Sequence, residues 1–375
     1  MNFELSEEQI IIRDSVNRFG ANRYDPAERL RPLTVDGGVD RARWRDMAEL
    51  GLLALPLAES HGGLGGSAVD VMVVMEAFGR HLMLEPYVTS CILALPLLMA
   101  GKGEVIEGVI AGIVEGRTQV ATAIAEVDAG FDLRHVATVA EKCDGGVRLS
   151  GTKTYVENGA DADWFILPAR TEGACDAHDG VSLFIVERNA PGIRIERFRG
   201  IDHRRHARLQ LDGVEIDETA LLGPLNGGGD LLEFAVDRAI TAHLAEALGS
   251  MEALRDMTLE YLKTRQQFGV AIGSFQALQH RMVDIAIACE EARSMTYHAT
   301  LRLEADPGTR RKAVSAAKAR VGQTALYVGR QAVQLHGGVG VSDELIVSHH
   351  LKRLMMIDLS YGNADYHRTR FADGS

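Results

Sequence analysis

Residues 230–264 read DLLEFAVDRAITAHLAEALGSMEALRDMTLEYLKT, an unbroken stretch of residues that favour helices. No proline interrupts it, and Ala, Leu, Met, Glu and Arg account for most of it. Two later stretches, 275–304 and 309–336, have the same character and nearly the same length. Three long helices in succession predict an antiparallel bundle in the C-terminal part of the chain.

The sequence before this region has a different character. Between 118 and 222, short alternating runs are separated by turn residues, which is typical of strands. Asn226-Gly227-Gly228-Gly229 separates the two regions, and Asp144-Gly145-Gly146 and Leu211-Asp212-Gly213 predict hairpin turns. The expected strands are 120–124, 136–140, 147–150, 164–167, 181–186, 193–198 and 209–216. They predict an antiparallel β unit.

The first third of the chain is helical in pattern. Ser6 and Gln9 form a capping box before a helix, and further helices are expected over 41–52, 68–81, near Leu93 and over 103–116. The fold class is therefore α+β, with an N-terminal helical domain, a central antiparallel β domain and a C-terminal long-helix bundle. The predicted domain boundaries are 1–117, 118–225 and 226–375.

Composition excludes several classes of protein. The chain has 375 residues, of which 46% are hydrophobic and 25% charged, as in ordinary globular proteins. Its net charge of −12 argues against nucleic-acid binding and anionic membranes. No basic region precedes an apolar run at the N-terminus, and no apolar run is long enough to span a bilayer. We expect a cytoplasmic protein.

Cysteine and histidine spacing indicates neither disulfides nor a metal. The four cysteines are scattered without paired spacing, as in reduced cytosolic proteins. His203 and His206 lie among arginines, whose positive charge opposes a metal ion, and His349 and His350 form no ligand pattern with them. No metal is therefore predicted.

A helix–loop–helix corner carries the first candidate binding residues. Lys263-Thr264-Arg265-Gln266-Gln267-Phe268-Gly269 ends one long helix, and Gln276 stands at the start of the next. One interpretation is a plain helix end with basic residues and a terminal glycine. The other is that Arg265, Gln267 and Gln276 hold a pyrophosphate and an adenine. Spacing alone favours the plain helix end.

Further motifs follow one another across essentially the whole chain: Gly51 to Gly65, Leu149-Ser150-Gly151-Thr152-Lys153, Glu157-Asn158-Gly159-Ala160 with Trp164, Thr264 to Gly269, Gln276-Ala277, and Ala332 to Gly340 (AVQLHGGVG). In this order they resemble the acyl-CoA dehydrogenase family. The resemblance implies FAD as cofactor and oxidation of acyl-CoA thioesters to trans-2-enoyl-CoA, in which a carboxylate takes the α-proton and flavin N5 the β-hydride.

The catalytic base departs from the commonest family pattern. Tyr361 stands where that pattern has its glutamate, and tyrosine is a poor base at neutral pH. Some relatives instead carry a base one residue before an arginine on the first bundle helix, which corresponds to Asp237 before Arg238. Glu246 is the alternative, but nine residues along a helix place it on the opposite side. Asp237 is therefore the predicted base, with Arg238 and Tyr361 on the substrate side. The remaining alternative is that Asp237 and Arg238 form an ion pair at the helix surface or an interface and take no part in catalysis.

The flavin-ring and CoA contacts depart from the pattern as well. Ala125 loses a hydroxyl at the ring edge but keeps its backbone N–H, and Phe131 replaces a serine that meets CoA. Tyr155 keeps an aromatic ring beside the flavin, whereas Glu157 replaces a hydroxyl at N5. A carboxylate there would disfavour the anionic reduced flavin unless it is screened.

The adenosine-side residues, in contrast, match the family. In relatives these positions reach a flavin held mainly by the neighbouring subunit, so the resemblance implies a homo- or hetero-oligomer, dimer or tetramer. Its partners would be a bulky or unusual acyl-CoA and an acceptor such as an electron-transfer flavoprotein. The matching residues are Arg265, Gln267, Phe268, Gln276, Gln334, Gly337 and Gly338.

The altered ring side leaves two other functions open. In one, the chain is a catalytically silent subunit that completes the FAD site of a partner acyl-CoA dehydrogenase, as in heteromeric pimeloyl-CoA and steroid side-chain enzymes. In the other, the chain keeps its flavin but acts as a flavin monooxygenase or a nitroalkane oxidase, both of which occur on this fold.

Overall fold

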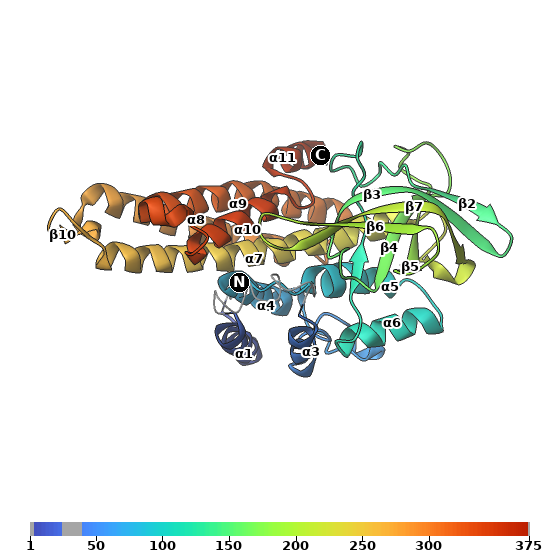
Figure 1. Ribbon diagram of the computed structural model, residues 1–375, viewed down its shortest axis with the longest axis horizontal. Coiled ribbons are helices and arrows are strands. Elements are labelled where there is room, and N and C mark those ends of the chain that lie inside the picture. Colours follow the sequence, from blue (N-terminus) through green and yellow to red (C-terminus); the bar gives the residue numbers. More distant parts are fainter. Residues whose placement is uncertain (1–3, 25–39, 374–375) are drawn as a thin grey trace. The chain divides into compact units, whose positions relative to one another are not determined.

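The computed structural model describes residues 4–24 and 40–373 (Figure 1). Contacts between residues divide the chain into two compact units. The helical unit takes its described residues from Met1–Arg31, Ser67–Met83 and Ile240–Ser375. The sheet unit takes its own from Pro32–Gly66 and Leu84–Ala239. Both units therefore include segments from the N-terminal part of the chain.

The sheet unit is built on an eight-stranded sheet in which β6, β7, β3, β2, β4, β5 and β8 follow one another and β1 pairs with β4. Most neighbours are antiparallel, as predicted, but β1 and β2 each meet β4 in parallel. The strands are β1 (Val120–Thr122), β2 (Val139–Cys143), β3 (Gly146–Glu157), β4 (Trp164–Arg170), β5 (Val181–Glu187), β6 (Ile193–Arg199), β7 (Arg205–Asp217) and β8 (Leu221–Leu222).

The core of the sheet unit comes from alternating apolar residues of the long strands. Leu149, Phe165 and Leu209 are fully buried and belong to one hydrophobic cluster on the sheet. β4 and β5 are buried almost throughout, whereas the outer strand β6 is largely exposed. This pattern is typical of a sheet whose central strands are covered and whose edge faces water.

One of the two predicted hairpin turns is wrong. Asp144-Gly145 does join β2 to β3, but Asp212-Gly213 lies inside β7. The β3–β7 register runs from Leu149 opposite Val214 to Gly151 opposite Leu211, so two residues of β7 face one residue of β3. Gly213 has a positive φ of 62°. A turn-like dipeptide has produced a β-bulge here because the strand continues to find partners on both sides of it.

Short helices pack around this sheet within the same unit. Trp44 is fully buried and donates its indole N–H to the Thr118 carbonyl at 3.3 Å. The predicted helix near Leu93 is a fully buried π-helix, a rare form. The elements are α3 (Arg41–Glu49), η1 (Glu59–His61), η2 (Val88–Ala94), α5 (Leu95–Leu98), α6 (Glu104–Val114) and η3 (Glu218–Ala220).

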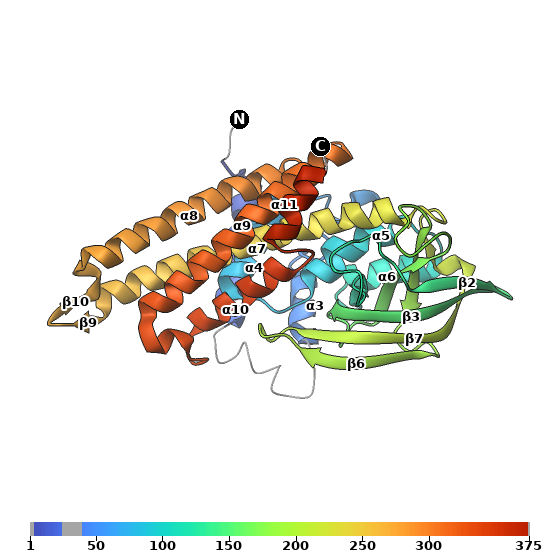
Figure 2. The same cartoon turned by 90° about the horizontal axis from the view of Figure 1, so that it is seen from above.

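The helical unit contains the long helices expected from the sequence. α9 packs against α8, α10 and α11 (Figure 2). α1 packs against α4 (Figure 1). The first residues of α7 belong to the sheet unit. Among the helices that the structure describes, none is long and apolar enough to cross a membrane. The helices are α1 (Glu7–Arg23), α4 (Ala68–His81), α7 (Gly228–Thr264), α8 (Gln276–Thr300), α9 (Pro307–His336), α10 (Ile346–Leu359) and α11 (Ala364–Asp373).

Local signals at the helix starts explain these bounds. The Ser6–Gln9 capping box is confirmed, and Ser67 with Asp70 forms a second one before α4. α9 begins two residues before the predicted Thr309, because Asp306 caps it and Pro307 takes its first turn. Proline is accepted there since the first helical N–H groups have no partner within the helix.

α4 and α7 cross at very short range through two glycines. A Cβ on Gly79 would lie 1.8 Å from the Glu246 carbonyl oxygen, and one on Gly249 would lie 1.8 Å from that of Glu76. Any larger residue would push the two backbones apart. This crossing anchors the segment of α7 that carries Glu246.

Candidate functional site

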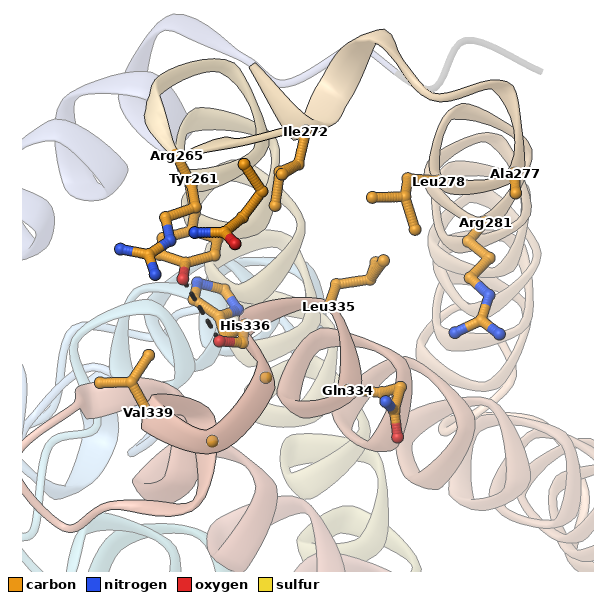
Figure 3. A pocket seen from close by; sticks show the side chains of 13 residues that line it. Tyr261, Arg265, Ile272, Ala277, Leu278, Arg281, Gln334, Leu335, His336 and Val339 are labelled. Carbon is orange, nitrogen blue, oxygen red and sulfur yellow. Dashed lines mark hydrogen bonds between the residues drawn. The ribbon is translucent and has the colours of Figure 1, made fainter. Parts of the chain in front are cut away.

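A cavity of about 660 Å³ opens in the helical unit, where the end of α7 meets the start of α8 and the end of α9 (Figure 3). Two short strands, β9 (Gln266–Gln267) and β10 (Val270–Ala271), and the turns η4 (Ile272–Ser274) and η5 (Gly337–Val341) close it. Its lining residues are Tyr261, Arg265, Gln267, Ile272, Ala277, Leu278, Arg281, Gln334, Leu335, His336, Gly337, Gly338 and Val339.

The corner between α7 and α8 is a tight hairpin. Phe268 and Gly269 connect β9 to β10 with positive φ values of 56° and 81°. A two-residue hairpin loop of this kind requires positive φ at both positions. Glycine meets the requirement without strain, but phenylalanine does not. Strain of this type is retained at functional sites when the surroundings enforce it.

Arginines give the cavity its charge. Arg265 and Arg281 lie on opposite sides of it (Figure 3) and no carboxylate belongs to its lining. Across residues 4–24 and 40–373, neither guanidinium takes part in an ion pair. In a chain with a net charge of −12, two such cations facing one cavity favour an anionic ligand.

The floor of the cavity is an aromatic pair at the end of α9. The rings of Tyr261 and His336 stack with centroids 4.5 Å apart, and Tyr261 Oη donates to the His336 carbonyl at 3.3 Å. His336 Nδ1 donates to the Ala332 carbonyl at 2.8 Å. Burial lowers the pKa of His336, so the ring is neutral near pH 7 and its Nε2 is an acceptor.

Glycines leave room beside this floor. Gly337 has a positive φ of 66° and follows the last residue of α9. A Cβ on Gly337 or on Gly338 would meet no atom within 4 Å. A ligand can therefore approach the backbone closely there, and two guanidinium groups face it across the cavity. This arrangement fits the adenosine and pyrophosphate end of a dinucleotide.

Five of the seven adenosine-side residues proposed from the sequence line this cavity, namely Arg265, Gln267, Gln334, Gly337 and Gly338. Gln276 is exposed next to the lining residue Ala277. Phe268 is outside the lining at the hairpin tip, where it is 90% exposed and meets Phe275 edge-on.

Sequence reasoning missed three polar members of the lining: Tyr261, Arg281 and His336. His336 lies inside the quoted AVQLHGGVG motif, and Arg281 lies four residues after Ala277 on α8, on the same face of the helix. Both signals were therefore present in the sequence. Tyr261 carries none, because an aromatic residue near a helix end is usually part of the core.

A second group of candidate residues lies in the sheet unit. Tyr155 has a positive φ of 49° and is 41% exposed on β3. Its ring stacks on His206 with centroids 4.3 Å apart. The backbone N–H of Thr154 donates to the Ala125 carbonyl at 2.7 Å. Ala125 and Tyr155 are therefore neighbours, as the resemblance implied, whereas Phe131 is 38% exposed on the following loop.

A buried ion pair fixes this neighbourhood. Lys153 Nζ, which is fully buried, donates to Glu126 at 2.7 Å, and Thr138 Oγ1 donates to the same oxygen at 2.6 Å. Burial raises the pKa of Glu126, but Lys153 and these hydrogen bonds outweigh it and lower the pKa overall. The carboxylate therefore stays ionised and joins the segment after Ala125 to β3.

Glu157 ends β3 and is screened by a cation. Arg204 donates to Glu157 at 3.2 Å, and both side chains are largely buried. The sequence alone does not indicate this pairing, because Arg204 stands 47 residues after Glu157. The structure supplies the screening that a flavin beside Glu157 would need.

The two candidate bases differ in surroundings. Asp237, in the sheet-unit part of α7, is fully buried, and the Arg238 guanidinium lies 5.7 Å from the centre of the Phe234 ring. Glu246, in the helical unit, is also fully buried, but both of its oxygens accept from Arg353 at 2.7 Å. A carboxylate held in this way is a poor proton acceptor.

Tyr361 follows α10 in the helical unit with a positive φ of 57°. His367 Nε2 donates to the Tyr361 carbonyl at 3.0 Å. The Tyr361 ring meets His243 edge-on at 5.8 Å. The Arg353 guanidinium lies 3.2 Å from His243 Nδ1, which helps to hold this ring in place. Tyr361 is thus held in one strained conformation by groups from two other helices.

Comparisons with known proteins agree with this architecture. Sequence models of the acyl-CoA dehydrogenase N-terminal, middle and C-terminal domains match residues 6–117, 121–214 and 231–375. Cyclohexane-1-carbonyl-CoA dehydrogenase of Geobacter metallireducens is 30% identical over 350 residues, covering 90% of this chain and 89% of that protein.

Two further comparisons extend over nearly the whole chain. An L-prolyl-peptidyl-carrier-protein dehydrogenase of Serratia sp. is 28% identical over 374 residues, covering 97% of this chain and 96% of that protein. The solved FAD complex of PigA has a TM-score of 0.91 at 26% identity and covers 100% of this chain and 98% of that one. The chain belongs to the acyl-CoA dehydrogenase family, whose members are FAD-dependent oxidoreductases acting on CH–CH bonds.

Proposed function

We propose that this chain is a subunit of an FAD-dependent dehydrogenase that introduces a double bond between Cα and Cβ of an acyl thioester. The observation that carries the proposal is the cavity at the end of α7. The guanidinium groups of Arg265 and Arg281 line this cavity, and neither forms an ion pair with any of the described residues. Gly337 and Gly338 leave room there for a ligand. An FAD pyrophosphate carries the negative charge that such a site accepts.

Arg265 and Arg281 hold the pyrophosphate in this proposal, and the polar side chains Gln267, Gln334 and Gln276 contact the adenosine. Phe268, at the tip of the hairpin between β9 and β10, also covers the adenosine. The FAD held here serves the ring site of a neighbouring chain, as the resemblance implies. The protein therefore works as a homo- or hetero-oligomer.

On the ring side, Tyr155 packs against the flavin and the Ala125 backbone N–H donates to its edge. When bound, FAD supplies the acceptor for the β-hydride. Asp237 takes the α-proton, and its full burial keeps bulk water away from the carboxylate. Glu246 is the less favoured base because Arg353 occupies both of its oxygens.

The substrate is a bulky or unusual acyl-CoA. Phe131 replaces a small polar side chain at the CoA contact and Tyr361 replaces a glutamate near the reacting carbons, so both positions are larger than the family pattern. Arg238 and Tyr361 are the residues that the resemblance assigns to substrate binding. The reducing equivalents then leave through an acceptor such as an electron-transfer flavoprotein.

A second candidate substrate is a thioester on a carrier protein. The similarity to the Serratia prolyl-carrier-protein dehydrogenase favours it. In that case the chemistry at Cα and Cβ is unchanged, and Phe131 meets the carrier arm in place of CoA.

The test is the visible absorption spectrum of the chain purified alone, before and after anaerobic addition of a mixed acyl-CoA pool and then of carrier-bound thioesters. A flavin band that bleaches with one class supports the proposal and selects the substrate. A colourless protein would favour the silent subunit, and oxygen consumption without thioester would favour a flavin oxidase.

Variants separate the two ends of the site. We expect Asp237→Asn to keep the flavin band and to lose bleaching by substrate. Unchanged turnover in this variant would remove the assignment of Asp237 as the base.

The arginine variants test FAD binding. Loss of each arginine contact to phosphate costs about 1.5–3 kcal/mol, so Arg265→Gln with Arg281→Gln weakens FAD binding by roughly a hundredfold or more. Arg320→Gln removes an exposed ion pair with Glu291 and is the matched control, which leaves FAD binding unchanged.

A further inference from the structure

A buried charge cluster lies at the end of β3 in the sheet unit. Arg204 donates to Glu157 at 3.2 Å, and its backbone N–H donates to Asp202 Oδ1 at 3.2 Å. Arg204 Nε also lies 4.0 Å from Asp202 Oδ2. The Arg204, Glu157 and Asp202 side chains are 7%, 15% and 1% exposed, so solvent screens their charges little.

An aromatic shelf continues from this cluster across three strands. Glu157 of β3 pairs with His206 of β7, and His206 pairs with Phe198 of β6. The His206 ring stacks on Tyr155 at 4.3 Å and on Phe198 at 5.7 Å, with interplanar angles of 27° and 24°. Tyr155 and Phe198 are 41% and 37% exposed. The two exposed rings lie 5.8 Å apart and are tilted by 50° to each other. With the His206 ring they form an aromatic surface that a flat ligand can contact.

We propose that Arg204 is a positioning residue for the flavin ring: it neutralises Glu157 and so allows the bound flavin to become negatively charged on reduction. The inference rests on the proposed function, because it takes the ring to lie on the shelf that begins at Tyr155. A hydride adds negative charge to the flavin. An uncompensated carboxylate at Glu157 opposes that charge, and the paired guanidinium removes the opposition.

Charge removal on either side of the pair has opposite effects. Arg204→Met removes a buried positive charge beside Glu157 and shifts the equilibrium toward the oxidised flavin. Glu157→Gln removes a buried negative charge and shifts the equilibrium toward the reduced flavin. The amide oxygen can still accept from Arg204, and Asp202 stays beside the guanidinium. The double variant returns close to the wild type. A purely structural role predicts losses of the same sign in both single variants.

The experiment measures the equilibrium between enzyme-bound flavin and a redox dye of known potential, under anaerobic conditions and without substrate. We expect at least a tenfold change in the reduction equilibrium constant for each single variant, in opposite directions. Arg148→Met is the matched control, because Arg148 forms an exposed pair with Glu215 on the same sheet at 2.7 Å. It leaves the equilibrium unchanged.

The outcomes separate this inference from the proposed function. A wild-type chain without a flavin band overturns both. If the wild type has a flavin band but Glu157→Gln does not change its reduction equilibrium, only the role of Arg204 is overturned. The same holds if both single variants change that equilibrium in the same direction. Glu157→Gln keeps the test decisive if Arg204→Met does not fold, since it retains the hydrogen bond within the buried cluster.

Discussion

Single residues in strained or buried states mark both parts of the site. Tyr155, Phe268 and Tyr361 all have positive φ, a conformation that costs free energy for residues with a bulky side chain. The sequence motifs point to all three residues, although no motif indicates that their backbone is strained. Their strain is maintained by defined contacts, such as the hydrogen bond from His367 to the Tyr361 carbonyl.

The buried pair of Glu246 and Arg353 supports Tyr361 through His243, and its loss is testable. Arg353→Met leaves a fully buried carboxylate without its bidentate partner, which costs about 3–5 kcal/mol of unfolding free energy. Urea unfolding measures this cost. We expect Arg353→Met combined with Glu246→Leu to lose much less, because no buried charge then remains.

The control for this pair is Arg320→Met, which breaks an exposed ion pair with Glu291. Surface pairs contribute about 0–1 kcal/mol, so its effect is small. An Arg353→Met loss as small as that of the control would mean that Glu246 is stabilised by other groups and that His243 is held independently of Arg353.

Helices and strands follow local signals except where tertiary pairing overrides them. α4 occupies its predicted range because Ser67 caps it, and Asp70 completes the capping box. Asp212-Gly213 predicts a turn, but β3 continues to pair with β7 beyond it, from Val214 to Asp217. The pairing of β6 with β7 ends at Leu211, just before the dipeptide. Local sequence cannot report this pairing, because the β3 residues that pair with β7 around Asp212-Gly213 lie 50 or more residues earlier in the chain.

The glycine crossing of α4 and α7 gives a prediction for these elements. Gly79→Ala and Gly249→Ala each place a methyl group 1.8 Å from a backbone oxygen that cannot rotate away. The two helices must separate, and we expect each variant to lose about 1–3 kcal/mol of unfolding free energy. Thermal or urea unfolding gives the value.

Gly108→Ala on α6 provides the comparison for the crossing. An added Cβ there meets no atom within 4 Å, and the residue lies inside a helix. Alanine then stabilises the helix by up to about 1 kcal/mol. The interpretation of the crossing fails if Gly79→Ala and Gly108→Ala change stability in the same direction.

For the whole molecule, the sequence reveals the order of the folded regions and five of the thirteen residues that line the cavity, but not the charge pairs. The adenosine-side residues come from two stretches, each with a recognisable motif. Arg204 with Glu157 and Arg353 with Glu246 are 47 and 107 residues apart. No periodicity in the sequence links such residues. Only the fold shows that Glu157 and Glu246 each accept hydrogen bonds from an arginine.

The acid stability of the molecule has a specific contributor in His367. Burial, with a smaller effect of Lys318, lowers the pKa of His367 from 6.5 to about 3. Between these values the unfolded chain binds a proton that the folded chain does not, so stability falls as the pH falls through this window. From pH 6.5 to 5 the loss from this group is about 2 kcal/mol.

His367→Gln tests this contribution. Glutamine is neutral at every pH and can still donate to the Tyr361 carbonyl, so the variant should lose about 2 kcal/mol less than the wild type between pH 6.5 and 5. Urea unfolding at the two pH values measures the difference. His280→Gln, which removes an exposed histidine, should behave as the wild type does. Equal acid sensitivity of all three proteins would exclude His367 as the cause.

The glycine contact between α4 and α7 also determines how long α4 remains without its partner helix during synthesis. Gly249 follows Gly79 by 170 positions. At a translation rate of 5–20 residues per second, α4 waits roughly 10–30 s on the ribosome for its partner helix. During that interval its buried face, which includes Val71, Val74 and Phe78, has no final packing. The sheet unit, emerging in between, completes its strands while the helical unit is still unfinished.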